Sequence, residues 1–152
     1  PPSGGNTRFA NCHLAYESLP ELLQQKIARR VAMNMYAYPS RNECKKLTKR
    51  EAEAHQHAHP MVRIHPDTGR KSLYINRLMT DYIVDMDETE SSELLDTLFD
   101  HMENEDFIYE HSWWNKDLVI WENRCLVHAR TNFDPSERRL LRRFALQGDK
   151  PS

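Results

Sequence analysis

The pattern of hydrophobic and polar positions predicts two amphipathic helices in an otherwise strand-rich chain. The first helix is expected to start at Ser18-Leu-Pro-Glu21, where serine and glutamate have the spacing of a capping box and proline suits the first turn. Its apolar face comprises Leu19, Leu22, Leu23, Ile27 and Val31. The second helix is expected near Thr89 or Ser91, either of which can cap it. Its apolar face comprises Leu94, Leu95, Leu98, Phe99 and Met102.

Short runs rich in β-branched, aromatic and other apolar residues account for most of the remaining apolar positions, and such runs are typical of strands. The runs are Thr7–Ala10, Met33–Tyr38, Met61–Ile64, Ser72–Ile75, Phe107–Tyr109, Leu118–Trp121, Leu126–Ala129 and Arg139–Leu146. Turn-forming residues separate several of them, at His65–Gly69 and at Asp134–Glu137. Strands do not alternate regularly with helices, so the order indicates a mainly β, antiparallel domain with helical insertions and no βαβ units.

Length and charge limit the classes of protein to consider. The chain has 152 residues, the size of one ordinary domain, so we expect residues 1–152 to form a single domain. A formal net charge of −2 offers no basic surface for nucleic acid. Trp113 and Trp114 are therefore expected to cover the edge of the core, not to stack on bases. No apolar run approaches the roughly 20 residues of a membrane span, so no membrane partner is expected.

Cysteine usage and one charged segment add two further expectations. Cys12, Cys44 and Cys125 are odd in number and lack C-x-x-C spacing, which indicates reduced thiols in a cytoplasmic protein. Residues 41–59 are rich in charge, short of large apolar side chains and end in a histidine tract. We interpret this segment as an exposed excursion, and as a candidate lid.

Candidate chemistry gathers near the C-terminus. Strand alternation places Leu126, His128 and Arg130 on one face, and Arg139 and Arg143 share parity on the following run. Imidazole is a common metal ligand, and the planar guanidinium fork binds a carboxylate through two parallel hydrogen bonds. Together these residues suit a metal centre that binds a dicarboxylic acid. Taken singly, the histidine also fits a surface or core position, and the arginines fit a solvated basic strand.

Several motifs in collinear order carry a family resemblance that covers nearly the whole chain. They are Gly4-Gly-Asn-Thr7, His59-Pro-Met-Val-Arg63, His65-Pro-Asp-Thr-Gly-Arg-Lys71, Leu73-Tyr-Ile-Asn76, Trp121-Glu-Asn-Arg124, His128, and Arg138-Arg139 through Arg143. With these motifs the chain resembles the C-terminal two-thirds of an Fe(II)- and 2-oxoglutarate-dependent dioxygenase of the taurine/phenoxyacetate dioxygenase (TauD/TfdA-like) family. The resemblance implies a double-stranded β-helix, or jelly roll, that is incomplete at its N-terminus.

The resemblance also implies roles for individual residues. His128 matches the distal histidine of the 2-His-1-carboxylate triad that binds iron. Arg139 and Thr7 match the residues that hold the distal carboxylate of 2-oxoglutarate. Arg143 matches a second arginine that contacts an anionic substrate in taurine dioxygenase-like members.

The implied activity is that of an oxygenase. Fe(II), 2-oxoglutarate and dioxygen would serve to hydroxylate a small, anionic organic substrate with release of succinate and carbon dioxide. Trp121 and Asn123 match residues of the strand that leads toward the site, and we assign them to shaping the pocket. The sequence does not name the substrate, and it leaves the oligomeric state open, a homo-oligomer included.

The remaining iron ligands are the main departure from the family pattern. Family members carry His-x-Asp or His-x-Glu upstream of the Gly-Gly-x-Thr segment, and the present sequence starts at about that point. His65-Pro-Asp67 has the same letters, but it follows Thr7 and matches a turn of the family. The tract His55-Gln-His57-Ala-His59 could chelate a stray divalent metal, although a solvated loop is the expectation.

Two hypotheses therefore stand. In the favoured one, the chain is part of a longer catalytic polypeptide, and these 152 residues by themselves turn nothing over. In the alternative, the chain is a catalytically incomplete dioxygenase fold that acts as a binding or assembly module, because the upstream His-x-Asp is lacking.

Overall fold

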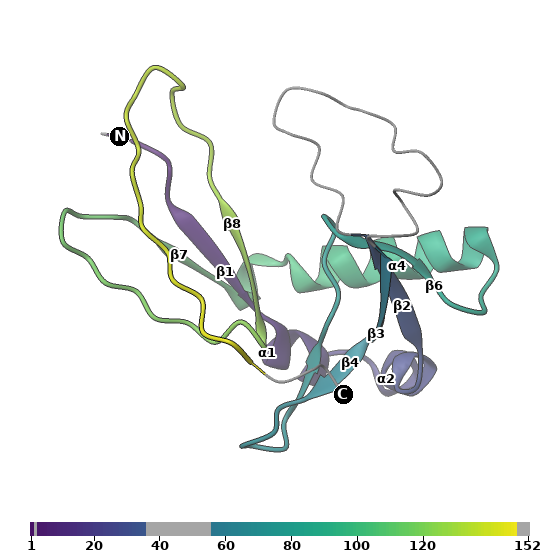
Figure 1. Ribbon diagram of the computed structural model, residues 1–152. Coiled ribbons are helices and arrows are strands. Elements are labelled where there is room, and N and C mark those ends of the chain that lie inside the picture. The colour runs from purple at the N-terminus through teal and green to yellow at the C-terminus, as the bar shows by residue number, and fades with distance from the viewer. Residues whose placement is uncertain (2, 36–55, 149–152) are drawn as a thin grey trace.

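The computed structural model describes Pro1, residues 3–35 and residues 56–148 (Figure 1). In chain order the elements are β1 (Thr7–Asn11), α1 (Cys12–Glu17), α2 (Glu21–Ile27), β2 (Val31–Met35), β3 (Gln56–Pro60), β4 (Val62–Ile64), β5 (Lys71–Leu73), β6 (Thr80–Ile83), α4 (Glu88–Met102), a 3₁₀ turn (Glu105–Phe107), β7 (Ile108–His111) and β8 (Leu126–Arg130). The strands form the sheets β7-β1-β8 and β3-β2-β6 and the hairpin β4-β5, and every pairing is antiparallel. No helix in the described ranges combines the length and the apolar character that crossing a membrane requires.

The sheet β7-β1-β8 has β1 at its centre, so β1 sets the faces of all three strands. Phe9 lies opposite Tyr109 on β7 and opposite His128 on β8. Directly opposed residues point to the same side of a sheet, so these three side chains share one face, which we call the His128 face. The other face carries Ala10, Ile108 and Val127, all of which pack against the core.

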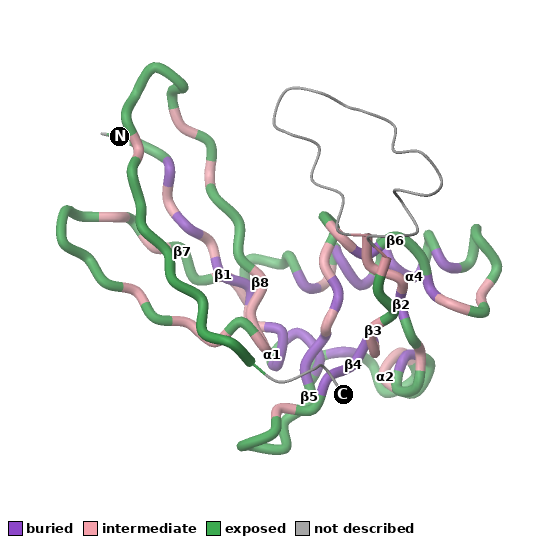
Figure 2. Tube along the Cα trace, viewed as in Figure 1, coloured by how far each residue is buried: buried purple, intermediate pink, exposed green. Residues whose placement is uncertain are grey.

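The core lies between the two three-stranded sheets, where Figure 2 shows buried segments along α1, β5 and α4. Helix α4 contributes the apolar face that the sequence predicts, and all of its members are buried: Leu94, Leu95, Leu98, Phe99 and Met102. The predicted caps are wrong, because the Asp87 carboxylate accepts from Thr89 N at 2.9 Å and Glu90 N at 3.3 Å. The Ser91 hydroxyl instead accepts from Ile83 N at 2.8 Å and so ties α4 to β6.

The start of α2 also differs from the prediction. Ser18 does not cap α2 but ends α1, where its hydroxyl donates to the Ala15 carbonyl at 3.1 Å. Helix α1 is an addition to the predicted elements: the Asn11 side chain accepts from two helix N–H groups, an N-terminal cap directly after β1. Of the expected apolar face, Leu19 and Ile27 are buried, whereas Leu22 is 80% exposed and Val31 lies on β2.

Most of the predicted strands that lie within the described ranges are present. Strands β1, β4, β5, β7 and β8 confirm five predicted strands, with shifts of one or two residues at their ends. The run Met33–Tyr38 begins earlier, as β2, and its last three residues lie outside the described residues. The last four residues of the expected lid, 56–59, belong to strand β3, which pairs with β2, whereas residues 41–55, with Cys44 and His55, lie outside the described residues. Strand β6 was not predicted from the sequence.

Two predicted strands, Leu118–Trp121 and Arg139–Leu146, are wrong as strands. Within the described ranges neither segment pairs with another strand. A β-type sequence becomes a strand only where its backbone N–H and C=O groups pair with another strand, and within the described ranges neither segment pairs with the outer edges of β7 and β8. Their apolar side chains remain in solvent: Ile120 is 86% exposed and Phe144 is 90% exposed.

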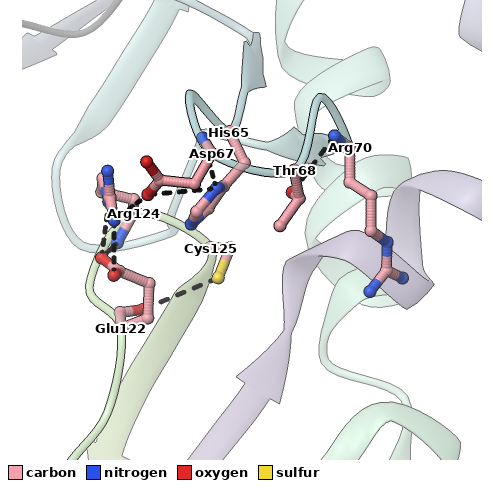
Figure 3. A network of polar contacts seen from close by, with 7 residues as sticks. All are labelled: His65, Asp67, Thr68, Arg70, Glu122, Arg124 and Cys125. Atoms are coloured by element: carbon pink, nitrogen blue, oxygen red, sulfur yellow. Dashed lines mark hydrogen bonds and ion pairs between the residues drawn. The ribbon is translucent and has the colours of Figure 1, made fainter.

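A polar network fixes the segment that leads into β8 (Figure 3). The Arg124 guanidinium donates to both oxygens of Glu122 at 2.8 Å and to Asp67 Oδ2 at 3.2 Å. Asp67 belongs to the turn of the β4-β5 hairpin, where its N–H also donates to His65 Nδ1 at 3.3 Å. The predicted turn is thus confirmed, and its aspartate holds the approach to β8 through Arg124.

The contrast between Leu98 and Leu22 predicts a difference in stability. Leu98→Ala removes a side chain with 0% exposure, so the lost burial and the residual cavity should lower the free energy of unfolding by about 2–5 kcal/mol. Leu22→Ala is the matched control, and it should change that free energy by less than about 0.5 kcal/mol. Denaturant unfolding of both variants checks this, and equal losses would contradict the placement of the core.

The Glu122–Arg124 contact predicts an acid-dependent loss of stability. Hydrogen bonds from Arg124 lower the pKa of the Glu122 carboxyl from 4.5 to about 2. A depressed pKa means that the contact stabilises the fold fully above pH 4.5 and that this contribution disappears as the pH falls toward about 2. Both side chains are partly exposed, so the contribution should stay below about 1 kcal/mol.

Unfolding measured from pH 6 to about 2 with Glu122→Gln as the comparison checks this effect. The variant should lose less stability than the wild type over the acid range. Identical slopes for the two proteins would show that the pair contributes nothing. Glu88→Gln, at an exposed position in the first turn of α4, serves as a control for general loss of carboxylate charge.

Candidate metal and dicarboxylate site

His128 lies in the middle of β8 on the His128 face. Its ring is 5.3 Å from the Trp121 ring and 6.2 Å from the Phe9 ring, measured between centroids. Although part of the side chain meets solvent, partial burial lowers the pKa of the imidazole, and the positive charge of Arg143 lowers it further. A lowered pKa keeps the ring neutral to more acid pH, and the neutral ring is the form that binds a metal ion.

The Gly4-Gly5 pair lets two chain segments approach the start of β1. Both glycines have positive φ, and a Cβ on Gly4 would lie 2.2 Å from the carbonyl oxygen of Asn132, beyond β8. A Cβ on Gly5 would lie 3.1 Å from Cδ of Arg139. The Arg139 Nε–H donates to the Gly5 carbonyl at 2.7 Å. Arg139 is therefore held close to β1 although its own segment is not a strand.

Thr7 is the first residue of β1 and is only 7% exposed. Its hydroxyl accepts a hydrogen bond from the indole Nε1–H of Trp113 at 2.9 Å. On β1 it lies opposite Arg130 of β8, and Phe9, opposite His128, is the next residue on the same face. The threonine therefore lies between the imidazole and the glycine pair that contacts Arg139.

Three arginines bring positive charge to this region. The guanidinium carbon of Arg130 lies 4.7 Å from the centroid of the Phe133 ring. Partial burial and the charge of Arg130 lower the pKa of Arg139. The charge of Arg143 adds to the effect of burial in lowering the pKa of His128. Among the residues that the structure describes, none of the three guanidiniums forms an ion pair with a carboxylate. Uncompensated positive charge of this kind favours an anionic ligand.

Trp121 and Asn123 occupy the positions assigned to shaping the pocket. The Trp121 ring lies 5.3 Å from the rings of both Phe9 and His128, so it forms a wall beside the imidazole. Its indole N–H donates to Asn123 Oδ1 at 2.8 Å, which fixes the orientation of the ring. An apolar groove continues from Trp121 between Phe9, Tyr109 and Leu126.

The described residues do not complete a metal centre around His128. Within Pro1, residues 3–35 and residues 56–148, no group of three His, Cys, Asp or Glu side chains could hold a metal ion. Burial raises the pKa of the Cys12 thiol to about 12 and also raises that of Cys125, so both are protonated thiols at neutral pH. Further ligands to a metal at His128 would have to come from outside these residues.

One residue that matters to the site, Trp113, was not identified from the sequence. The expectation for it was a place at the edge of the core, but its indole reaches Thr7 across the sheet. A single tryptophan in a loop has no spacing pattern that reveals such a contact. The one available signal is chemical, because a partly buried indole N–H requires an acceptor.

Comparison with known proteins connects this geometry to a family. The model of the "Taurine catabolism dioxygenase TauD, TfdA family" matches residues 1–145. Pentalenolactone F synthase of Streptomyces avermitilis is 35% identical over 167 residues, covering 100% of this chain and 55% of that protein. The alpha-ketoglutarate-dependent 2,4-dichlorophenoxyacetate dioxygenase of Cupriavidus pinatubonensis is 36% identical over 152 residues, covering 98% and 52%. The chain thus spans about half the length of these curated relatives.

Solved structures agree. The crystal structure of AAD-2 in complex with Mn(II) and N-oxalylglycine has a TM-score of 0.81 at 33% identity, covering 90% of this chain and 55% of that one. A taurine dioxygenase from Burkholderia xenovorans has a TM-score of 0.75 at 28% identity, covering 87% and 42%. The similarity confirms the predicted mainly β fold of the double-stranded β-helix class. The chain belongs to the TauD/TfdA dioxygenase family.

Proposed function

We propose that this chain carries the C-terminal part of the active site of an Fe(II)- and 2-oxoglutarate-dependent oxygenase. One observation carries the proposal: an imidazole with a lowered pKa, a buried hydroxyl, and guanidiniums that form no ion pair with a carboxylate of the described residues lie close to the start of β1 and to β8. A ferrous ion suits the imidazole, and a dicarboxylate suits the cations and the hydroxyl. The proposal treats residues 1–152 as one domain of a cytoplasmic protein and leaves homo-oligomerisation open.

Each residue has a distinct task in this proposal. His128 would bind iron through a ring nitrogen, and the lowered pKa reduces competition from protons. Arg139 would hold the distal carboxylate of 2-oxoglutarate as a counter-charge, with Thr7 donating a hydrogen bond to the same group. Trp121 would wall the site beside the iron. When bound, iron with 2-oxoglutarate and dioxygen supplies the oxidising chemistry, with succinate and carbon dioxide as by-products.

We further propose that the substrate is a small organic anion that becomes hydroxylated. Arg143 supports this, because its charge acts on His128 while no carboxylate of the described residues neutralises it. The relative named for 2,4-dichlorophenoxyacetate acts, by that name, on a compound with a carboxylate. In the present chain Arg143 would pair with the corresponding charge of its own substrate.

A binding or assembly module remains the second candidate. Its support is the lack of a three-ligand metal group within the described ranges, together with exposed apolar side chains such as Phe144. In the oxygenase proposal, a His-x-Asp or His-x-Glu from elsewhere in the protein completes the triad. In the module no such pair exists, and iron would not be held. The two functions therefore differ in one measurable property, iron-dependent binding of 2-oxoglutarate.

Anaerobic spectroscopy distinguishes these two functions. Full-length protein with Fe(II) and 2-oxoglutarate should develop a visible charge-transfer band, because the band requires the keto acid on a metal held by the complete triad. His128→Ala should abolish the band, whereas His57→Ala, at an exposed position on β3, should retain it. If the wild-type protein gives no band, the module is the better description.

Replacement of Arg139 tests the dicarboxylate anchor. Arg139→Ala should weaken 2-oxoglutarate binding by about 2–5 kcal/mol, because the carboxylate would lose its counter-charge in a partly buried site. That loss corresponds to roughly 30- to 4,000-fold in Kd, measured by anaerobic calorimetry with Fe(II) or Mn(II). Arg142→Ala, which removes an exposed arginine of the same segment, should leave Kd unchanged. Equal affinities for Arg139→Ala and wild type would refute the role.

A further inference from the structure

We propose that Trp113 is a positioning residue that orients the Thr7 hydroxyl as a hydrogen-bond donor toward the distal carboxylate of the cosubstrate. The inference rests on the proposed function, in which Thr7 and Arg139 hold that carboxylate. It assigns to the indole a task that is separate from packing. Trp113 does not contact the cosubstrate in this proposal but acts on it through Thr7.

The direction of the hydrogen bond is fixed by chemistry. An indole N–H can only donate, so at 2.9 Å the Thr7 oxygen must be the acceptor. A threonine hydroxyl has one proton and two acceptor lone pairs, and the indole occupies one lone pair. No hydrogen bond among the described residues uses the remaining Thr7 proton. That proton is therefore available to a carboxylate, which can only accept.

The surroundings hold the indole in place. The Trp113 ring packs edge-on against His111 at 4.6 Å, with the planes at 84°. His111 in turn contacts Asp117 Oδ2 through Nε2 at 3.1 Å and Tyr109 Oη through Nδ1 at 3.3 Å. The same Asp117 oxygen accepts from Trp114 N at 2.8 Å, which closes the turn after β7. The indole N–H of Trp113 is thus a hydrogen-bond donor in a fixed position. Its partner Thr7 is β-branched and rotates little about χ1.

The fixed position of this donor matters for ligand binding, because the Thr7 hydroxyl can turn either its proton or a lone pair toward a ligand. A lone pair facing a carboxylate would repel it, whereas the proton forms a charge-assisted hydrogen bond. With one lone pair engaged by the indole, the hydroxyl has fewer unproductive orientations to lose when the ligand binds. The expected gain in affinity is on the order of three- to tenfold, the range of one oriented hydrogen bond.

The test is a double-mutant cycle on full-length protein, with Kd for 2-oxoglutarate measured anaerobically in the presence of Mn(II). Trp113→Phe keeps an aromatic ring against His111 and removes the indole N–H donor together with one ring, and Thr7→Val removes the hydroxyl at nearly constant shape. Trp113→Phe should weaken binding about three- to tenfold in the wild-type background and have no further effect beside Thr7→Val. Trp114→Phe, at the neighbouring 80% exposed tryptophan, should match wild type.

A second ligand separates positioning from structural damage. 2-Oxobutyrate keeps the keto acid group but lacks the distal carboxylate, so Trp113→Phe should leave its binding unchanged. Equal weakening for both ligands, equal weakening in both Thr7 backgrounds, or unchanged 2-oxoglutarate binding would each overturn the inference. Wild-type protein that binds no 2-oxoglutarate would overturn the proposed function itself, and the inference with it.

Discussion

The register of β1 between β7 and β8 is the constraint on which the site depends. Thr7 opposes Arg130 and Phe9 opposes His128, so residues more than 115 positions apart meet on one face. A slip of one residue between β1 and β8 would turn the side chains that one of these strands contributes to the site toward the core. The pairing of the strands therefore determines which side chains lie together at the site. The glycine pair extends the ladder between β1 and β8, because Gly5 N donates to Asn132 O and the lack of a Cβ on Gly5 leaves room for Arg139 beside the start of β1.

Local signals in the sequence predicted the parts of the fold that depend on local physics. The buried face of α4 and the β4-β5 hairpin followed from periodicity and turn residues. Errors arose where a distant partner decides the outcome. Leu22 has helical spacing but is 80% exposed, and Arg139–Leu146 has strand composition but pairs with no strand of the described residues. At the caps, Asp87 took the place of Thr89 because several adjacent residues could each serve.

For the site, the sequence indicated which residues take part better than it indicated how the fold holds them in place. The sequence and its family resemblance pointed to His128, Thr7 and Arg139 as candidate ligands, and the alternation argument placed His128 correctly on a face with Arg130. The parity argument for Arg139 does not apply, because its segment is not a strand, and a hydrogen bond to Gly5 holds it instead. Trp113 belongs to no spacing pattern in the sequence that would have assigned it to the site. Its contact with Thr7 arises from the turn after β7, which only the folded chain defines.

The arginines around His128 differ in their charge partners from several others of the chain. Arg8 contacts Glu105, Arg70 contacts Glu17 and Arg77 contacts Asp100. Around His128 no carboxylate of the described residues plays that part, and burial, with repulsion between neighbouring positive charges in second place, lowers the pKa of the His128 imidazole and of the Arg139 guanidinium. Like charges held together reduce stability unless a ligand neutralises them, and groups with shifted pKa values are common at functional sites. A dianionic keto acid beside a metal cation would resolve both effects at once, since the metal takes the place of the proton on the imidazole and the carboxylate provides the missing counter-charge.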